Sequence, residues 1–138
     1  MKNTPRHILP IIVFAQFAGT SLWFAGNAIL PQIQLAWNLP QDSIAQVTSS
    51  VMLGFIVGTL FFALTSVADR FSATKVFFIS TLLGAFLNSV ILLTQESFVL
   101  LLVFRFLTGI CIAGIYPVGM KISSEWFEGK LGKALGYL

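Results

Sequence analysis

A single arginine inside an apolar stretch is the residue best placed to do chemistry in this sequence. Arg105 is about eight residues into a stretch that begins at Phe98, so in a helix it would lie ~12 Å along the axis. An arginine at such a depth in a bilayer costs about 2.5–3.5 kcal/mol unless polar groups or water surround it. Arg105 therefore indicates an anion- or proton-coupling site. The alternative is a structural arginine that contacts polar groups or carbonyls of the first apolar stretch.

The first apolar stretch has polar and aromatic side chains at helical spacing. At 100° per residue, four of them lie within about 60° of one another on one face of a helix. They are Gln16, Thr20, Trp23 and Asn27. A face of this composition is expected to turn toward protein or water and not toward lipid.

The helix that would contain Arg105 has a similar face, formed by Arg105, Gly109, Ile112 and Tyr116. Ordinary hydrogen bonds between membrane helices, worth about 0.6 kcal/mol each, would account for any one of these residues. Two such faces in one chain favour a shared cavity. The predicted substrate or proton pathway consists of Arg105, Gln16, Thr20, Trp23, Asn27 and Tyr116.

Other reactive groups in the sequence do not form a recognisable catalytic or metal-binding set. Cys111 is the single cysteine and His7 the single histidine, so neither a disulfide framework nor a metal-ligand set is predicted. The apolar stretches contain no HExxH motif, no paired acids and no cysteine with a histidine, and the chain has no ATP-binding loop. We therefore predict no enzyme, no metal site and no cofactor.

The composition predicts a membrane protein. Hydrophobic residues make up 57% of the 138 positions and charged residues 9%, whereas a soluble domain has about 25% charged residues. A bilayer core of about 30 Å needs about 20 apolar residues per helix. The stretches predict an all-α polytopic protein in contact with the lipid bilayer. Its transmembrane helices are predicted at residues 8–30, 44–68, 76–94 and 98–120, and a fifth helix would begin at 131–138.

Two other interpretations of the basic residues fit the sequence less well. Lys2 and Arg6 precede the first stretch as in a secretory signal, but this stretch exceeds the usual apolar length and holds polar residues. The net charge of +3 could suit nucleic acid, yet the basic residues are not clustered with aromatic residues on one surface. No nucleic-acid partner is predicted.

The basic residues also predict the orientation, because lysine and arginine favour cytoplasmic loops. Outside the apolar stretches they fall in three segments that would share one side of the membrane: Lys2, Arg6, Arg70, Lys75, Lys121, Lys130 and Lys133. The loops of the opposite side contain the acids Asp42 and Glu96 and no basic residue. The prediction is an amino terminus in the cytoplasm, with the protein in the cell (inner) membrane.

Local sequence signals predict where the helices begin, end and pack. Pro31 would follow the end of the first helix, and Ser43 with Gln46 would form a capping box at the start of the second. Gly54 and Gly58 form a pair of small residues that favours close helix packing.

Two further residues have structural predictions of their own. Asn88 is expected to act as a packing contact between helices and not as a ligand contact. Pro117 has no backbone N–H, so it should bend or loosen the fourth helix.

The sharpest motif is the turn at residues 67–75, Val-Ala-Asp-Arg-Phe-Ser-Ala-Thr-Lys. Its order of residue types resembles the signature loop between helices two and three of the major facilitator superfamily, with Thr65 and Ser72 where the family has glycine. Arg105 followed by Gly109 is similar to a second motif of that family. The resemblance covers the whole chain, which would correspond to the first third of a twelve-helix transporter.

The resemblance implies a secondary active transporter that moves a small solute by alternating access. In that family two six-helix bundles rock about a midplane site, and helices one and four of the first bundle line the cavity. The matched residues Asp69, Arg70 and Lys75 would belong to a cytoplasmic gate, and Arg105 would take part in substrate or proton coupling. The expected partners are lipid, a small-molecule substrate with proton coupling as an option, and the remainder of the transporter.

Two alternatives to a transporter fragment stay open. A complete small protein would have residues 131–138 as a nearly uncharged cytoplasmic tail. A small helical scaffold or assembly partner without transport activity would need only the packing glycines, but it leaves Arg105 and the polar face of the first helix unexplained.

Overall fold

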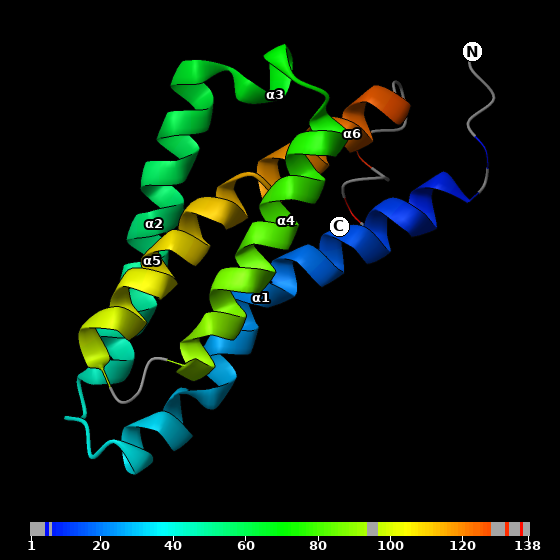
Figure 1. Cartoon of the computed structure of the whole chain (residues 1–138). Coiled ribbons are helices and arrows are strands. Elements are labelled where there is room, and N and C mark those ends of the chain that lie inside the picture. The colour runs from blue at the N-terminus through cyan, green and yellow to red at the C-terminus, as the bar shows by residue number, and fades with distance from the viewer. Residues whose placement is uncertain (1–4, 6, 94–96, 128–131, 133–135, 137–138) are drawn as a thin grey trace.

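The computed structural model describes residues 5, 7–93, 97–127, 132 and 136, which fold into helices and turns without any strand. Four helical segments are long and apolar enough to cross a membrane: Ile8–Ala36, Ser43–Thr65, Ala73–Leu93 and Phe98–Trp126. The prediction of an all-α polytopic membrane protein is therefore confirmed. The helices form an elongated bundle, with α3 and the end of α6 at one end and the connection from α1 to α2 at the other (Figure 1).

The described elements are α1 (Ile8–Ala36), α2 (Ser43–Thr65), α3 (Val67–Arg70), α4 (Ala73–Val90), the 3-10 helix η1 (Ile91–Leu93), α5 (Phe98–Ala113) and α6 (Tyr116–Trp126). Some of the predicted features lie outside the described residues. They are the end of the third helix at Thr94, most of the fifth helix at 131–138, and the charges of Lys2, Arg6, Glu96, Lys130 and Lys133.

The sequence predicts that the first helix ends before Pro31. The structure differs, because α1 continues to Ala36. Proline removes one hydrogen bond from a helix, and membrane helices tolerate this loss where neighbouring groups compensate. The helix ends where Asn38 adopts a left-handed conformation with φ of 51°, which asparagine accepts more readily than most residues. The Leu39 N–H then donates to the Gln34 carbonyl at 2.9 Å, as in a Schellman motif.

The predicted capping box is also wrong. Asp42 occupies the N-cap position of α2 without a capping hydrogen bond from its side chain. Ser43 is already the first residue of the helix, so its hydroxyl cannot cap it. The Gln46 side-chain amide instead donates to the Asp42 carboxylate. Gln46 thus forms a side-chain hydrogen bond at the start of the helix, as predicted, but its partner is Asp42 and not Ser43.

The other helix ends also differ from the sequence prediction. The second helix stops at Thr65 and not at residue 68, because Ser66 adopts a left-handed conformation before the short helix α3. The fourth helix continues beyond residue 120, to Trp126. It is interrupted after Ala113, the residue whose carbonyl would have accepted from the missing N–H of Pro117. The predicted loosening of this helix by proline is thus confirmed.

The closest helix packing joins α2 to α5. A Cβ atom built on Gly54 would lie 1.9 Å from the Phe106 carbonyl oxygen, and one on Gly109 would lie 2.1 Å from the Val51 carbonyl oxygen. A Cβ on Gly58 would lie 2.8 Å from the Ile110 Cα. The two backbones are therefore in direct contact, and the packing role predicted for Gly54 and Gly58 is confirmed.

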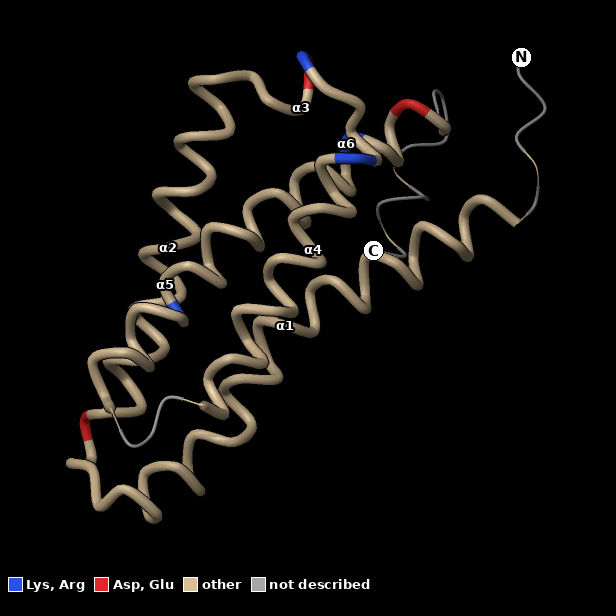
Figure 2. The backbone as a smooth tube through the Cα atoms, in the orientation of Figure 1, with Lys and Arg blue, Asp and Glu red and all other residues tan. Residues whose placement is uncertain are grey.

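The exterior of the bundle is apolar. Phe14, Phe17, Leu64 and Phe86 are each more than half exposed, and such a surface requires lipid or further protein around it. The described charges lie near the two ends of the bundle, except for one basic position along α5 (Figure 2). Length, composition and surface together define an integral membrane protein.

Candidate functional site

Arg105 on α5 is fully buried, with 0% of its surface exposed. Its Nη2 donates to the Asn27 side-chain oxygen at 2.8 Å and to the Trp23 carbonyl at 3.1 Å. Its Nη1 donates to the Asn88 side-chain oxygen at 3.3 Å and, at 3.5 Å, to the Leu22 carbonyl. One guanidinium thereby links α1, α4 and α5, and we call this group of contacts the arginine node.

The arginine node accounts for the burial of a charge without a carboxylate. Among the described residues the only ion pair joins Lys121 to Asp69, so the partners of Arg105 are carbonyl and amide oxygens without a formal charge. Four hydrogen bonds of even ~0.6 kcal/mol each offset most of the insertion cost of about 2.5–3.5 kcal/mol. The contacts match the structural alternative stated for Arg105, a guanidinium bound to polar groups and carbonyls of the first helix.

Gly26 makes room for the arginine node. A Cβ atom on Gly26 would lie 2.1 Å from Nη1 and 2.6 Å from Cζ of Arg105, so the guanidinium lies directly against the backbone of α1. The Nε of Arg105 is buried and has no hydrogen-bond partner within the part of the chain that the structure describes. Gly26 was not predicted as a site residue, because a glycine opposite an arginine on another helix leaves no periodic signal.

Asn88 was predicted as a packing contact, and it does connect two helices. Its partner is Arg105, which makes it part of the buried polar group. A sequence signal exists for this pairing: Asn88 is eight residues before position 96, and Arg105 is eight residues after position 97. In two antiparallel helices joined by a short turn, residues at equal distances from the turn lie at similar depth.

A pocket of about 290 Å³ opens next to the arginine node. It is lined by Thr20, Trp23 and Phe24 of α1, Phe55 of α2, Ile112 of α5 and Tyr116 of α6. The rings of Trp23 and Phe55 meet edge to face, with 5.8 Å between centroids and 85° between planes. Thr20, Trp23 and Tyr116 of the predicted pathway therefore line one cavity.

The remaining pathway residues lie elsewhere. Arg105 and Asn27 belong to the arginine node and do not line the pocket. Gln16 is 1% exposed, and its amide donates to the Tyr116 carbonyl at 3.4 Å. Its oxygen is buried against Gly119, where a Cβ would lie 1.8 Å away. The structure thus divides the predicted set into a pocket, a buried arginine and a glutamine that links α1 to α6.

Trp23 connects the node and the pocket. Its carbonyl accepts a hydrogen bond from Arg105, while its side chain lines the pocket against Phe55. The guanidinium and the pocket wall thus share one residue.

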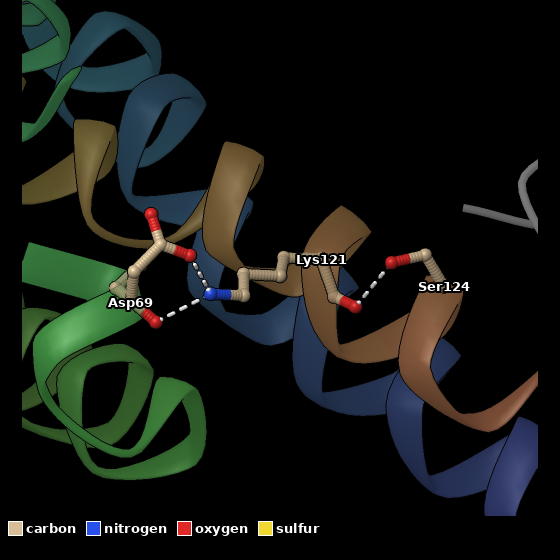
Figure 3. A network of polar contacts seen from close by, with 4 residues as sticks. Asp69, Lys121 and Ser124 are labelled. Atoms are coloured by element: carbon tan, nitrogen blue, oxygen red, sulfur yellow. Dashed lines mark hydrogen bonds and ion pairs between the residues drawn. The ribbon is translucent and has the colours of Figure 1, made fainter. Parts of the chain in front are cut away.

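A second polar cluster joins α3 to α6. The Lys121 ammonium forms an ion pair with Asp69 and also donates to the Ala68 carbonyl at 2.6 Å. The Ser124 hydroxyl donates to the Lys121 carbonyl at 2.7 Å (Figure 3). The Asp69 side chain is 72% exposed, so this ion pair is worth about 0.2–1 kcal/mol.

Of the three residues matched to the gate motif, only Asp69 takes part in an ion pair within the described segments. Arg70 and Lys75 are exposed. The partner of Asp69, Lys121, was predicted only to mark the orientation. It is the first basic residue after the fourth apolar stretch. Because that stretch crosses back to the side of the membrane where Asp69 lies, the two residues are expected at the same end of the bundle.

The described fold is that of a helical integral membrane protein with an open pocket of about 290 Å³ on its helices. A family model described as "Major Facilitator Superfamily" matches residues 12–138. The chain belongs to the major facilitator superfamily.

Two curated relatives match part of the chain. A Homo sapiens protein named "Putative transporter SVOPL" is 31% identical over 104 residues, which are 74% of this chain and 20% of that protein. The Mus musculus protein of the same name is 30% identical over 104 residues, with the same shares covered. The chain thus spans about a fifth of the length of these relatives. No solved structure gives a significant match.

Proposed function

We propose that this chain is the amino-terminal part of the first bundle of a secondary active transporter, which moves a small solute by alternating access. The observation that carries the proposal is the pocket, because it is formed by the polar and aromatic face of α1 together with α2, α5 and α6. Membership in the superfamily and the transporter name of both relatives support it. We assign no enzymatic activity and no cofactor to the chain.

Alternating access requires helices that change position around a site near the midplane. The interruption between α5 and α6, at Gly114 and Ile115, suits such a change because it replaces a continuous hydrogen-bonded ladder by a short turn. Tyr116 follows the interruption directly and lines the pocket. In the proposed cycle, movement of α6 relative to α5 would reshape the wall of the site.

We assign Arg105, with Asn27 and Gln16, to coupling and not to direct solute contact. The arginine node holds α1 against α4 and α5, so it can transmit a change of the pocket to the bundle. Asp69, Arg70 and Lys75 are proposed to act at the cytoplasmic gate, with Lys121 holding Asp69 in position. In this proposal the amino terminus lies in the cytoplasm and the protein in the inner membrane.

Transport by the natural protein that contains this chain, at its full natural length, tests the proposal. The purified protein is reconstituted in vesicles, and uptake of a panel of labelled organic acids, amines, sugars and uncharged aromatics is measured with and without an imposed pH gradient. Saturable uptake of at least one solute is expected.

A matched pair of variants ties uptake to the pocket. Thr20→Phe fills the pocket, and it removes only a hydroxyl that donates to the Gln16 carbonyl of the same helix. Ser89→Phe makes a comparable change on the exposed side of α4, where the hydroxyl also donates within its own helix. Uptake should fall in the first variant and persist in the second. Inserted protein with no uptake of any solute would favour the scaffold alternative.

A further inference from the structure

The size and walls of the pocket indicate the body of its ligand. Four of the six described residues that line the pocket are aromatic: Trp23, Phe24, Phe55 and Tyr116. Aromatic rings stack on, or meet edge to face, a flat apolar partner. An apolar cavity of about 150 Å³ accommodates benzene, and the pocket measures about 290 Å³. A flat body of one or two rings therefore fits it.

Two of the described polar side chains that line the pocket can donate a hydrogen bond to a ligand. The Trp23 indole N–H and the Tyr116 hydroxyl make no hydrogen bond with any residue in the described ranges. An indole nitrogen can only donate. The Thr20 hydroxyl already donates to the Gln16 carbonyl. Among the described residues that line the pocket there is neither aspartate nor glutamate, so a ligand with an acceptor group is favoured.

The arginine node adds a positive charge beside the pocket. Arg105 donates to the carbonyl of Trp23, whose ring lines the pocket, and no carboxylate of the described residues pairs with it. Aromatic faces by themselves attract cations. A cation in this pocket would be repelled by the charge of Arg105 behind Trp23, which no acid of the described residues pairs with, whereas an anion would be attracted to it.

We propose that the pocket takes an organic monoanion with a flat aromatic body of one or two rings and one carboxylate-like group. The aromatic walls hold the body, and the Tyr116 hydroxyl and the Trp23 indole donate to the anionic group. The inference rests on the proposed function in treating the pocket as the solute site.

Equilibrium binding of three probes with the same ring system tests the ligand class. The complete natural protein is placed in nanodiscs of phosphatidylcholine, a lipid without net charge. Binding of 2-naphthoate, 2-naphthylmethanol and 2-naphthylmethylammonium is then measured. Naphthoate should bind about tenfold more tightly than the alcohol, and the ammonium compound should bind more weakly than the alcohol.

Two variants locate the binding. Tyr116→Phe should weaken naphthoate binding by about tenfold, as expected for one lost hydrogen bond to a charged group, and should leave binding of the alcohol nearly unchanged. Phe86→Leu, on the exposed side of α4, should leave all three affinities unchanged.

The outcomes separate this inference from the proposed function. Tighter binding of the ammonium compound, unchanged naphthoate binding in Tyr116→Phe, or no binding of any probe would overturn the ligand class. Saturable uptake of an uncharged or cationic solute, without competition from naphthoate, would also overturn it and leave the transporter proposal intact. Binding in the expected order by a protein that transports nothing would support the ligand class and count against transport.

Discussion

Gly26→Ala tests whether the position of Arg105 is set by its close approach to α1. The new Cβ would lie 2.1 Å from Nη1 and 2.6 Å from Cζ of Arg105, whereas ordinary van der Waals distances begin near 3.4 Å. The guanidinium must therefore move by more than 1 Å. Such a shift breaks the hydrogen bonds to the Asn27 side chain and the Trp23 carbonyl, which measure 2.8 and 3.1 Å.

The energetic cost of Gly26→Ala comes from the hydrogen bonds of Arg105 that break. Hydrogen bonds between membrane helices contribute about 0.6 kcal/mol each, and those to charged groups in soluble proteins about 1.5–3 kcal/mol. At the value for membrane helices, breaking two to four of them costs about 1.2–2.4 kcal/mol, the positive charge adds to this cost, and the helix propensity of alanine returns up to about 1 kcal/mol. We expect Gly26→Ala to reduce the free energy of unfolding by about 1–3 kcal/mol.

The assay is unfolding of the purified complete protein in detergent, with Gly84→Ala as the matched control. Gly84 is also a buried glycine in a spanning helix, but its Cβ would meet its nearest atoms at longer distances, Leu22 Cδ1 at 3.0 Å and Cys111 Cβ at 3.2 Å. Those side chains can adjust by a few tenths of an ångström, so the control should cost clearly less than Gly26→Ala.

A double-mutant cycle with Arg105→Met identifies the cause. In the Arg105→Met background, the loss of unfolding free energy caused by Gly26→Ala should be smaller by at least about 1 kcal/mol, because the clash and the displaced hydrogen bonds no longer exist. An equal cost in both backgrounds, or a Gly26→Ala variant as stable as the Gly84→Ala control, would refute the described position of Arg105.

Three further predictions concern the complete natural protein. In a Cys111→Ala background, a cysteine at exposed Gln41 should react with an impermeant thiol reagent added outside cells and one at exposed Thr74 should not; the opposite pattern would reverse the orientation. Asp69→Asn removes an ion pair worth about 0.2–1 kcal/mol. A reporter cysteine at the cytoplasmic gate should therefore react with a thiol reagent up to about fivefold faster. An unchanged rate would count against a gating role. Arg105→Leu should insert normally but reduce uptake per inserted molecule to background, and near-normal uptake would make the arginine purely structural.

The sequence was sufficient for the spanning helices because their signal is a long apolar run, which depends on no distant contact. Helix ends depend on single residues, and there the prediction was weaker. Pro31 predicts an end of the first helix, but the loss of one N–H does not outweigh the interactions that hold α1 helical to Ala36. Ser66 ended α2 early through a left-handed conformation, for which serine gives no sequence signal.

The candidate site was predicted in part. Thr20, Trp23 and Tyr116 were identified because polar and aromatic residues at helical spacing stand out in an apolar helix, and they line the same pocket. Phe24 and Phe55 also line it, but among many phenylalanines nothing in the sequence separates those that face a cavity from those that face lipid. The partners of Arg105 and of Asp69 likewise depend on how the helices are arranged, which periodicity within one helix does not specify.

The close glycine packing between α2 and α5 has a mechanical consequence. At Gly54 and Gly109 each backbone lies against a carbonyl of the other helix, so neither helix can rotate or slide against its neighbour without a collision between main chains. Side chains can change rotamer, but peptide groups have no such freedom. We therefore expect the pair to move as a stiff unit during a rearrangement, with the deformation taken up outside it, as at the turn between α5 and α6.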